Sequence, residues 1–421
     1  MKEEQDRQPG LVGSLTRRLE GFDFEEGALL VQVPQVPLNL LEREVACQRG
    51  YFAYPPQGAL YLAAVFRKLN LPATVVDLNF VVLKEAQKEG GQVEAAWQRA
   101  LDEALEQYER PFLGLSFMFE MTYPDFVKVC RHLRARRPGA CLAAGGVAAT
   151  ADPDRLLKEG VVDLVFSHQG DTSLEGFYAY LRGQREEAPP NLSFLDAQGE
   201  VIQTEMVKDG EINQDIRAEY DLIPIADYQR VGSLSNYSRM NGIDVPFATL
   251  LSRRGCRGRC TFCGVRGFAG RGVKVRDNEN LLAEMEHLYH CYGIKHFDWL
   301  DDDPLFKAET ALDLFQQMAK RLPGVTWAYN NGLVASSVTA ELMEAMRISG
   351  CIGFKVGLES GNLEMLKKIR KPITIKKFFD FAQMAAGFPE IFIGVNFILG
   401  LPGETLGQML DSLKVALAAK L

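Results

Sequence analysis

Short apolar runs alternate with amphipathic helical patterns along most of this chain of 421 residues. The run Ala28–Val33 is followed by a helical pattern over Gly58–Leu69, and a second apolar run follows at Ala73–Leu78. A fully apolar strand followed by a helix is typical of parallel sheets, because the helix returns the chain to the end where the next strand begins. The alternation therefore predicts an α/β fold with parallel strands.

The N-terminal part of the chain repeats this alternation. Further strands are predicted at Phe112–Met118, Cys141–Ala144 and Val162–Phe166, each followed by a helical pattern. We therefore predict a doubly wound, Rossmann-like domain over residues 28–183, preceded by a polar extension over residues 1–27. In such sheets, ligands bind outside the carboxyl ends of the strands.

A polar stretch with two prolines opens a connector over residues 184–246, in which Asn191–Thr204 is predicted to form a small hairpin. A second series of strand–helix units follows, and its spacing of roughly 30 to 45 residues is typical of a β/α barrel. Five units predict a partial barrel over residues 247–421. A sixth strand is missing from this count, which is the result expected if the sequence is truncated at its C-terminal end. The predicted strands are Ala248–Ser252, His296–Leu300, Thr326–Tyr329, Gly353–Leu358 and Phe392–Leu399.

Charge and hydropathy exclude several classes of protein. With 47 Lys and Arg against 55 Asp and Glu, the formal net charge is −8, which does not favour nucleic acid as a partner. No apolar run reaches the roughly 18 residues of a membrane span, and the charged segment Met1–Arg18 lacks the apolar core of a signal peptide. Without a secretory signal, the eight cysteines favour reduced thiols. We expect a cytoplasmic protein without a membrane span.

Three cysteines are grouped in the spacing Cys256-x3-Cys260-x2-Cys263, directly after the first strand of the second series. Three thiolates on one short loop suit a metal ion or a cluster, because the backbone can wrap around it. A structural zinc site needs four ligands, whereas a [4Fe–4S] cluster held by three thiolates keeps one iron open for a substrate or cofactor. We favour the cluster; a zinc site and unligated thiols are the alternatives.

Eight basic residues and no acidic residue lie between Arg253 and Arg276. In a chain of net negative charge, such a segment has two interpretations. It forms a solvated basic loop or a local nucleic-acid contact, or it compensates the charge of cluster thiolates and of an anionic cofactor. The two interpretations do not exclude each other.

The cysteine spacing, with Phe262 before the last cysteine, resembles the signature of the radical S-adenosylmethionine (radical SAM) superfamily. The acidic segment His296–Phe306 resembles the second-strand region of its cobalamin-dependent branch. Gly357–Gly361 and Gly400–Glu404 are similar to the fourth-strand and fifth-strand regions of that branch. Asn396 departs from the pattern, because the family often places glycine there.

This resemblance implies a [4Fe–4S] cluster that Cys256, Cys260 and Cys263 ligate, and a SAM molecule that chelates the open iron. It places the ammonium group of SAM, or the substrate, near Asp302 and Asp303. The alternative for these carboxylates is that they cap the following helix. The residues that the resemblance places near SAM are Phe262, Asp302, Asp303, Glu359, Ser360, Ile398 and Leu399.

The N-terminal region resembles the cobalamin-binding domain that is fused to many radical SAM enzymes. The segment Tyr54–Ala64 is similar to the opening helix of that domain. Glycines near the carboxyl ends of strands suit a flat macrocycle, because they let it approach the backbone. Asp77, Thr150 and Asp163 are further positions that match the domain. The resemblance implies that cobalamin lies near Ser116, Gly145, Gly146 and His168.

The sequence departs from the family pattern at two places that concern cobalamin binding. The loop Pro34–Asn39 contains no histidine, so this loop offers none to the lower face of the cobalt. The acidic Gly-Glu-Gly-Glu turn that is usual in this branch is replaced by Ser167–Thr172, in which His168 offers a polar contact instead. The alternative is that the domain has lost cobalamin and serves as scaffolding.

By the same resemblance, the protein is a radical SAM enzyme that reductively cleaves SAM to a 5′-deoxyadenosyl radical. The implied outcome is cobalamin-dependent methylation of a carbon centre of a small molecule, with flavodoxin or ferredoxin as the electron donor. The alternatives are radical cyclisation, oxidation or rearrangement, with or without cobalamin, and a non-catalytic protein that binds cobalamin or docks another enzyme. Methylthiolation of tRNA is disfavoured, because the N-terminal region contains no second cysteine triad.

Overall fold

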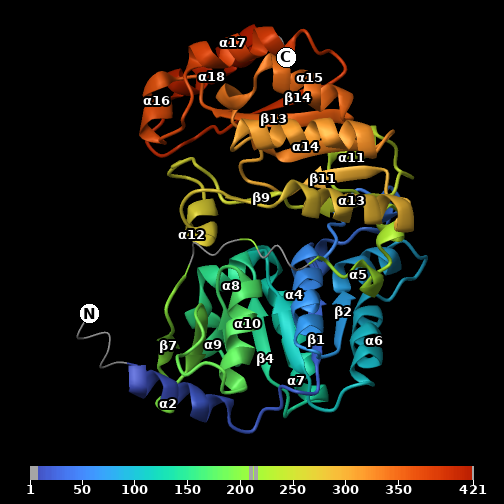
Figure 1. Cartoon of the computed structure of the whole chain (residues 1–421), viewed down its shortest axis with the longest axis vertical. Helices are drawn as coiled ribbons and strands as arrows, with labels where there is room; N and C mark the ends of the chain where they lie inside the picture. Colours follow the sequence, from blue (N-terminus) through green and yellow to red (C-terminus); the bar gives the residue numbers. More distant parts are fainter. Residues whose placement is uncertain (1–7, 208–211, 213–216, 420–421) are drawn as a thin grey trace. The chain divides into compact units, whose positions relative to one another are not determined.

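The structure is a computed structural model that describes residues 8–207, 212 and 217–419. The chain divides into two compact units, Met1–Ser233 and Leu234–Leu421, and each is built around one main sheet (Figure 1). The division between the units falls inside the predicted connector.

Unit one contains a seven-stranded sheet in the order β2-β1-β3-β4-β5-β6-β7. The first five strands are parallel, which confirms the predicted Rossmann-like architecture. The direction of strand addition reverses between β1 and β3, and ligands bind at such a switch point in doubly wound sheets. The strands are β1 (Ala28–Gln32), β2 (Ala73–Asp77), β3 (Phe112–Ser116), β4 (Leu142–Gly145), β5 (Leu164–Phe166), β6 (Leu192–Leu195) and β7 (Val201–Gln203).

Helices cover both faces of this sheet (Figure 1). On one face, Phe66 of α4 and Tyr178 of α10 pack edge to face at 5.4 Å between ring centroids. On the other face, Trp97 of α6 and Phe126 of α7 belong to a buried core that includes Leu29 and other strand residues. The helices of the unit are α2 (Gln8–Leu19), α3 (Arg43–Cys47), α4 (Gln57–Lys68), α5 (Leu78–Ala86), α6 (Val93–Leu105), α7 (Tyr123–Arg136), α8 (Val147–Ala151), α9 (Pro153–Lys158) and α10 (Gly170–Leu181).

Two features of unit one differ from the sequence expectations. The predicted hairpin forms, but β6 pairs antiparallel with β5, so the hairpin extends the first sheet and is part of unit one. Helix α5 was not expected, because its apolar sequence resembles the end of a strand. The side chain of Asp77 starts this helix by accepting hydrogen bonds from the backbone N–H groups of Asn79 (2.9 Å) and Phe80 (3.2 Å).

Unit two contains a five-stranded parallel sheet in the order β14-β13-β12-β11-β8. Each strand lies beside the one before it in the sequence, which is the order of a β/α barrel and confirms the five predicted units. The strands are β8 (Phe247–Leu250), β11 (His296–Trp299), β12 (Thr326–Leu333), β13 (Cys351–Glu359) and β14 (Phe392–Phe397). The helices are α11 (Asn236–Met240), α12 (Val265–Ala269), α13 (Asn278–Tyr292), α14 (Ala308–Arg321), α15 (Ala340–Ile348), α16 (Leu363–Lys368), α17 (Ile375–Ala385) and α18 (Leu406–Ala419).

Aromatic side chains fix the helix layer of unit two on its sheet. Phe315 of α14 stacks on Trp327 of β12, with ring centroids 4.9 Å apart, and Trp299 of β11 meets the same indole edge to face at 6.3 Å. All three side chains are buried. Among the described residues, no helix combines the length and the apolar character needed to cross a membrane.

Candidate functional site

The three predicted ligands lie on one loop, residues 252–276, whose two ends are joined at its base. We call it the cysteine loop. After β8, the short strand β9 (Arg253–Arg254) pairs antiparallel with β10 (Lys274–Val275), and the N–H of Arg276 donates to the carbonyl of Ser252 at 2.9 Å. At this neck, Gly255 has φ +88°, and a Cβ atom there would lie 2.6 Å from the carbonyl oxygen of Gly272. Glycine is therefore needed for the two arms of the loop to approach each other.

Two of the three thiols converge on one point of the loop. A Cβ atom built on Gly258 would lie 3.3 Å from Sγ of Cys256 and 3.7 Å from Sγ of Cys260, and the N–H of Gly258 donates to Cys256 Sγ. The third thiol, Cys263, is exposed, and its N–H donates to the carbonyl of Cys260 at 3.3 Å. The structure thus brings the sulfurs of Cys256 and Cys260 to one point of the loop, and the backbone of Cys263 is bonded to that of Cys260.

Burial raises the pKa of the Cys256 thiol, and the charges of Asp303 and Asp302 add to this, while the N–H of Gly258 lowers it. Burial also raises the pKa of Cys260, which the charge of Lys371 opposes. Across the described ranges, no three His, Cys, Asp or Glu side chains are arranged to hold a single metal ion. A [4Fe–4S] cluster takes each thiolate on a different iron atom, and the donor set of three thiols matches that requirement.

Three consecutive carboxylates follow β11 and face the base of this loop. Asp301 is bonded to Ser252, Asp302 to the N–H of Gly255, and Asp303 to Arg257. Burial raises the pKa of Asp301 to about 6, so this carboxyl group is ionised at neutral pH. In the structure α14 begins at Ala308 without a side-chain cap, so these carboxylates do not cap it.

Several of the basic residues between Arg253 and Arg276 have structural partners. Arg253 is fully buried and donates to the hydroxyl of Ser252 (2.7 Å) and to a backbone carbonyl. Arg276 forms a buried ion pair with Glu284 of α13 at 2.5 Å. Arg257 pairs with the buried carboxylate of Asp303. These three side chains thus support the loop; Arg253 and Arg276 are buried, whereas Arg257 is exposed.

A second wall of the site comes from the carboxyl ends of β13 and β14. Glu359 is buried and has a positive φ of 71°, which is a strained conformation for a residue other than glycine. Its backbone carbonyl accepts from the N–H of Ile398 at 2.9 Å, so two residues predicted near SAM are neighbours. Ser360 is buried and its hydroxyl accepts from the N–H of Asn362, whereas Leu399 is exposed.

Lys371 completes this wall, and the sequence patterns did not single it out. Its ammonium group donates to Glu359 Oε1 at 2.8 Å, and its charge acts on Cys260. In the same turn, the carbonyl of Ile369 accepts from the N–H of Thr261 in the cysteine loop at 3.0 Å. The segment after α16 therefore joins the cysteine loop to the end of β13. The only signal in the sequence was a basic cluster after α16, which is common on surfaces.

Replacing Lys371 with methionine is expected to destabilise unit two by about 2 kcal/mol, because it leaves the carboxylate of Glu359 buried without its partner. The two side chains are 15% and 10% exposed. The matched control is Lys376→Met, which removes an ion pair with Asp380 whose side chains are 85% and 59% exposed and should cost less than about 0.5 kcal/mol. Urea unfolding measures both; equal losses in the two variants would contradict the prediction.

In unit one, the predicted cobalamin residues meet at the carboxyl ends of β3, β4 and β5. Ser116 and Gly145 are paired in register, and Gly145 is paired in turn with Phe166. Gly146 has φ +106°, and a Cβ atom there would lie 2.6 Å from the carbonyl oxygen of Phe117. His168 is buried, with φ +61°, and its N–H donates to the hydroxyl of Thr150 at 2.9 Å. Four predicted residues thus lie at one edge of the sheet.

Exposed apolar side chains follow the carboxyl ends of the same strands. Leu40 follows β1, Phe119 and Met121 follow β3, and Val147 follows β4, and each of these side chains is exposed. An edge with glycines and exposed apolar side chains suits a broad, flat ligand whose faces are largely apolar. These residues therefore fit the cobalamin that the resemblance implies.

Asp77 lies at the neighbouring end of β2, under a segment that follows the hairpin. The hydroxyl of Tyr228 donates to Asp77 Oδ2 at 2.6 Å, and burial raises the pKa of Asp77 to about 6. The side-chain amide of Gln57 in α4 donates to the hydroxyl of Tyr220 at 3.0 Å. The residues around 220–231 therefore cover the carboxyl end of β2 and belong to unit one.

The elevated pKa of Asp77 predicts a pH dependence of stability. Between about pH 4 and pH 6 the unfolded chain has lost this proton while the folded chain keeps it, so stability falls as pH rises through this window, by on the order of 3 kcal/mol. Asp77→Asn keeps acceptors for the N–H groups of α5 and should remove this slope. Urea unfolding of both proteins from pH 4 to pH 7 measures it, and parallel curves would show that Asp77 does not titrate in this range.

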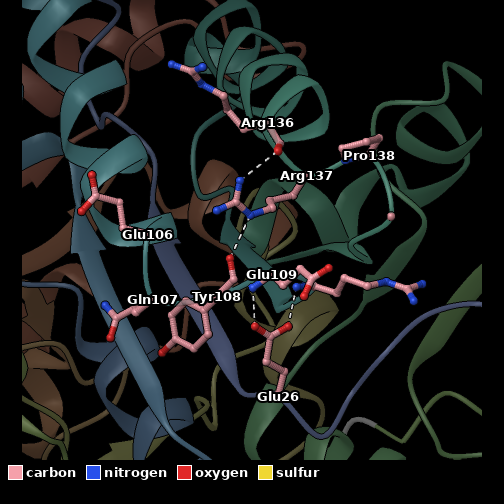
Figure 2. A pocket seen from close by; sticks show the side chains of 10 residues that line it. Glu26, Glu106, Gln107, Tyr108, Glu109, Arg136, Arg137 and Pro138 are labelled. Atoms are coloured by element: carbon pink, nitrogen blue, oxygen red, sulfur yellow. Dashed lines mark hydrogen bonds between the residues drawn. The ribbon is translucent and has the colours of Figure 1, made fainter.

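A shallow, strongly charged pocket of unit one lies away from all of these residues (Figure 2). Its lining residues precede β1, β3 and β4, so it opens at the amino ends of the strands. The carboxylate of Glu26 accepts from the backbone N–H groups of Glu109 and Arg110, and Arg137 donates to the carbonyls of Tyr108 (2.9 Å) and Leu105 (2.7 Å). The charged groups of Glu26 and Arg137 thus bond to the backbone of unit one. None of the predicted site residues lines the pocket.

Comparison with known proteins gives two family matches. Residues 251–416 match the Radical SAM superfamily, and residues 44–176 match the B12 binding domain. An uncharacterized methyltransferase of Pyrococcus horikoshii is 22% identical over 364 residues, which cover 86% of this chain and 73% of the relative. Cytidylyl-2-hydroxyethylphosphonate methyltransferase of Streptomyces wedmorensis is 24% identical over 385 residues, which cover 84% of this chain and 71% of the relative.

Solved structures share the fold. The radical SAM methyltransferase TsrM from Kitasatospora setae, solved with tryptophan substrate and a SAM analogue, has a TM-score of 0.74 at 17% identity and matches 94% of this chain and 71% of its own. The cobalamin-dependent SAM radical enzyme OxsB, solved with aqua-cobalamin and SAM, has a TM-score of 0.72 at 16% identity and matches 96% of this chain and 52% of its own.

Proposed function

This chain contains a radical SAM domain and a B12-binding domain, as its motifs predict, and we propose that it is a cobalamin-dependent radical SAM methyltransferase. Its proposed cofactors are a [4Fe–4S] cluster, SAM and cobalamin. When bound, the cluster supplies one electron to cleave SAM and cobalamin supplies a carrier for the methyl group. The observation that carries the proposal is the loop of Cys256, Cys260 and Cys263, closed at its base and positioned by the end of β11.

In unit two, the three cysteines hold the cluster at three of its four iron atoms, which leaves the fourth for SAM. The neighbouring ends of β13 and β14 supply the remaining contacts of SAM. Glu359 and Ser360 face the ribose or methionine portion, and Ile398 and Leu399 offer backbone groups to the adenine, with Phe262 nearby. Lys371 keeps the carboxylate of Glu359 in place for this role.

In unit one, cobalamin lies outside the carboxyl ends of β3, β4 and β5. Gly145 and Gly146 let the macrocycle approach the backbone, and Ser116 and His168 offer polar contacts. Exposed apolar side chains, which include Leu40, Phe119 and Val147, cover its hydrocarbon faces. The chain's own part in the reaction is to bind both cofactors, to orient SAM against the open iron and to keep water from a reactive radical.

The substrate that we propose is a small molecule that is methylated at a carbon atom. Both relatives described above are methyltransferases, and the second one is named for a small-molecule substrate. An acidic one-electron carrier such as flavodoxin or ferredoxin is the proposed electron donor, and the chain acts in the cytoplasm.

The test is an anaerobic assay of protein reconstituted with iron, sulfide and cobalamin. SAM labelled in its methyl group is supplied with dithionite as reductant and with an extract of small metabolites. We expect release of 5′-deoxyadenosine or transfer of the label to a small molecule, and neither in Cys256→Ala. Release of 5′-deoxyadenosine without any methyl transfer would favour cyclisation, oxidation or rearrangement. The absence of both products in reconstituted protein would contradict a radical SAM function.

A further inference from the structure

The backbone of the cysteine loop is held by three consecutive side chains that lie outside it. Asp301 is fully buried at the end of β11. Its Oδ1 atom accepts hydrogen bonds from the N–H groups of Ser252 (2.7 Å) and Arg253 (2.8 Å), and its Oδ2 atom accepts from the hydroxyl of Ser252. The strand that leads into the loop is therefore fixed by one carboxylate.

The next two carboxylates continue this contact along the loop. Asp302 Oδ2 accepts from the N–H of Gly255 at 3.2 Å. Asp303 Oδ2 accepts from the N–H of Arg257 at 3.3 Å, and both oxygens of Asp303 bind the guanidinium of Arg257, at 2.6 and 2.8 Å. Three neighbouring carboxylates thus accept hydrogen bonds from four backbone N–H groups on both sides of Cys256. The donors are Ser252, Arg253, Gly255 and Arg257, and their order along the chain is the same as that of the carboxylates.

We propose that Asp301, Asp302 and Asp303 are positioning residues that hold the cysteine loop in its ligating shape before the cluster binds. The inference rests on the proposed function, because it assigns these residues to a cluster loop. It also changes the role predicted for Asp302 and Asp303, which the resemblance placed near the ammonium group of SAM. Both oxygens of Asp303 are already used by Arg257, so this side chain is committed to the loop.

Hydrogen bonds from N–H groups to ionised carboxylates are about twice as strong as neutral ones. Without its cluster, the cysteine loop is a long segment outside the sheet. Its ligands must nevertheless be held close to their binding geometry, because a metal centre is captured well only by ligands in that geometry. The acceptors of Asp301 and Asp303 are buried, so water does not compete for these bonds.

Two substitutions of Asp302 separate a positioning role from a contact with SAM. An asparagine side chain at this position keeps an oxygen that accepts from the N–H of Gly255, but it has no charge for an ammonium group. We therefore expect Asp302→Asn to assemble the cluster and to bind SAM like the wild type. We expect Asp302→Ala to assemble the cluster about tenfold more slowly, which is the effect of one such hydrogen bond. The matched control is Glu309→Ala, an exposed carboxylate on α14.

Two measurements test this. The first is hydrogen exchange of the apoprotein, in which the N–H of Gly255 should be protected in the wild type and in Asp302→Asn and should exchange at least about tenfold faster in Asp302→Ala. The second is the rate of anaerobic cluster assembly, followed by visible absorbance and iron content, with circular dichroism to confirm that each variant is folded. Asp302 is only partly buried, so its alanine variant is expected to fold even where Asp301→Ala does not.

The outcomes are distinct. Slow assembly and fast exchange in Asp302→Ala alone would support the proposal. Unchanged exchange and assembly in Asp302→Ala would overturn it while leaving the proposed function intact. Normal assembly together with a loss of SAM affinity in Asp302→Asn would overturn it in favour of a contact with SAM. A wild-type protein that takes up no cluster at all, although its loop is protected from exchange, would overturn the proposed function and not the preformed loop.

Discussion

Replacing Cys260 with alanine is expected to reduce the iron content of reconstituted protein from about four atoms per chain to less than one. Cys260 is the central ligand of the three: its sulfur lies beside the same point of the loop as that of Cys256, and its carbonyl accepts from the N–H of Cys263. Two thiolates cannot hold a cubane cluster against solvent. Cleavage of SAM should fall below detection, because the cluster that would pass an electron to SAM is lost.

The matched control for this variant is Cys291→Ala. Cys291 is exposed near the end of α13 and lies outside the cysteine loop, so its loss should leave iron content and SAM cleavage unchanged. Iron and sulfide analysis after anaerobic reconstitution, with circular dichroism as the test of folding, measures both variants. A Cys260→Ala protein that keeps close to four iron atoms would show that the cluster is held elsewhere.

Replacing Gly146 with valine is expected to abolish cobalamin binding and to destabilise unit one by about 3 kcal/mol. The backbone of Gly146 has φ +106° and ψ 178°, which side chains other than glycine almost never adopt, and its Cβ would lie 2.6 Å from a backbone oxygen that cannot move aside. Gly160→Val is the control, since it has φ +68° with open space around it and should cost about 1 kcal/mol without affecting cobalamin.

Gly145→Ala separates the ligand from the fold. A Cβ atom at Gly145 meets only the carbonyl oxygen of Phe166, at an ordinary distance of 3.6 Å, so the variant should be as stable as the wild type. If the macrocycle rests on this backbone, the added methyl group should weaken cobalamin binding about tenfold or more. Titration of cobalamin by absorbance and urea unfolding measure the two effects. Unchanged affinity in both glycine variants would place cobalamin elsewhere or show that the domain is scaffolding.

The sequence predicts the architecture well where one local rule dominates. The alternation of apolar strands and helices indicated the parallel strands of both main sheets, and the spacing of Cys256, Cys260 and Cys263 identified the loop that the structure closes between β9 and β10. Helix α5 was missed because its apolar sequence continues from β2, and only the cap at Asp77 ends the strand. That contact depends on a side chain turning back onto the backbone, which hydropathy does not reveal.

The parts of the site that could not be predicted depend on contacts between distant segments. Lys371 bonds to Glu359 on the other side of helix α16, and a basic residue after a helix gives no sign of this partner. Asp302 and Asp303 were expected near SAM or at a helix N-terminus, and the structure shows them, together with Asp301, bonded to the cysteine loop 46 to 49 residues earlier in the chain. Such pairings follow from the order of strands in the sheet and become visible only with the fold.

The most direct test of the account is electron paramagnetic resonance of the reduced, anaerobically reconstituted protein, recorded with and without SAM. A cluster tethered by Cys256, Cys260 and Cys263 has one iron that lacks a protein thiolate, so SAM should bind there and change the shape of the cluster signal. We expect this change in the wild type and no cluster signal in Cys260→Ala. A cluster signal that is the same with and without SAM would contradict it.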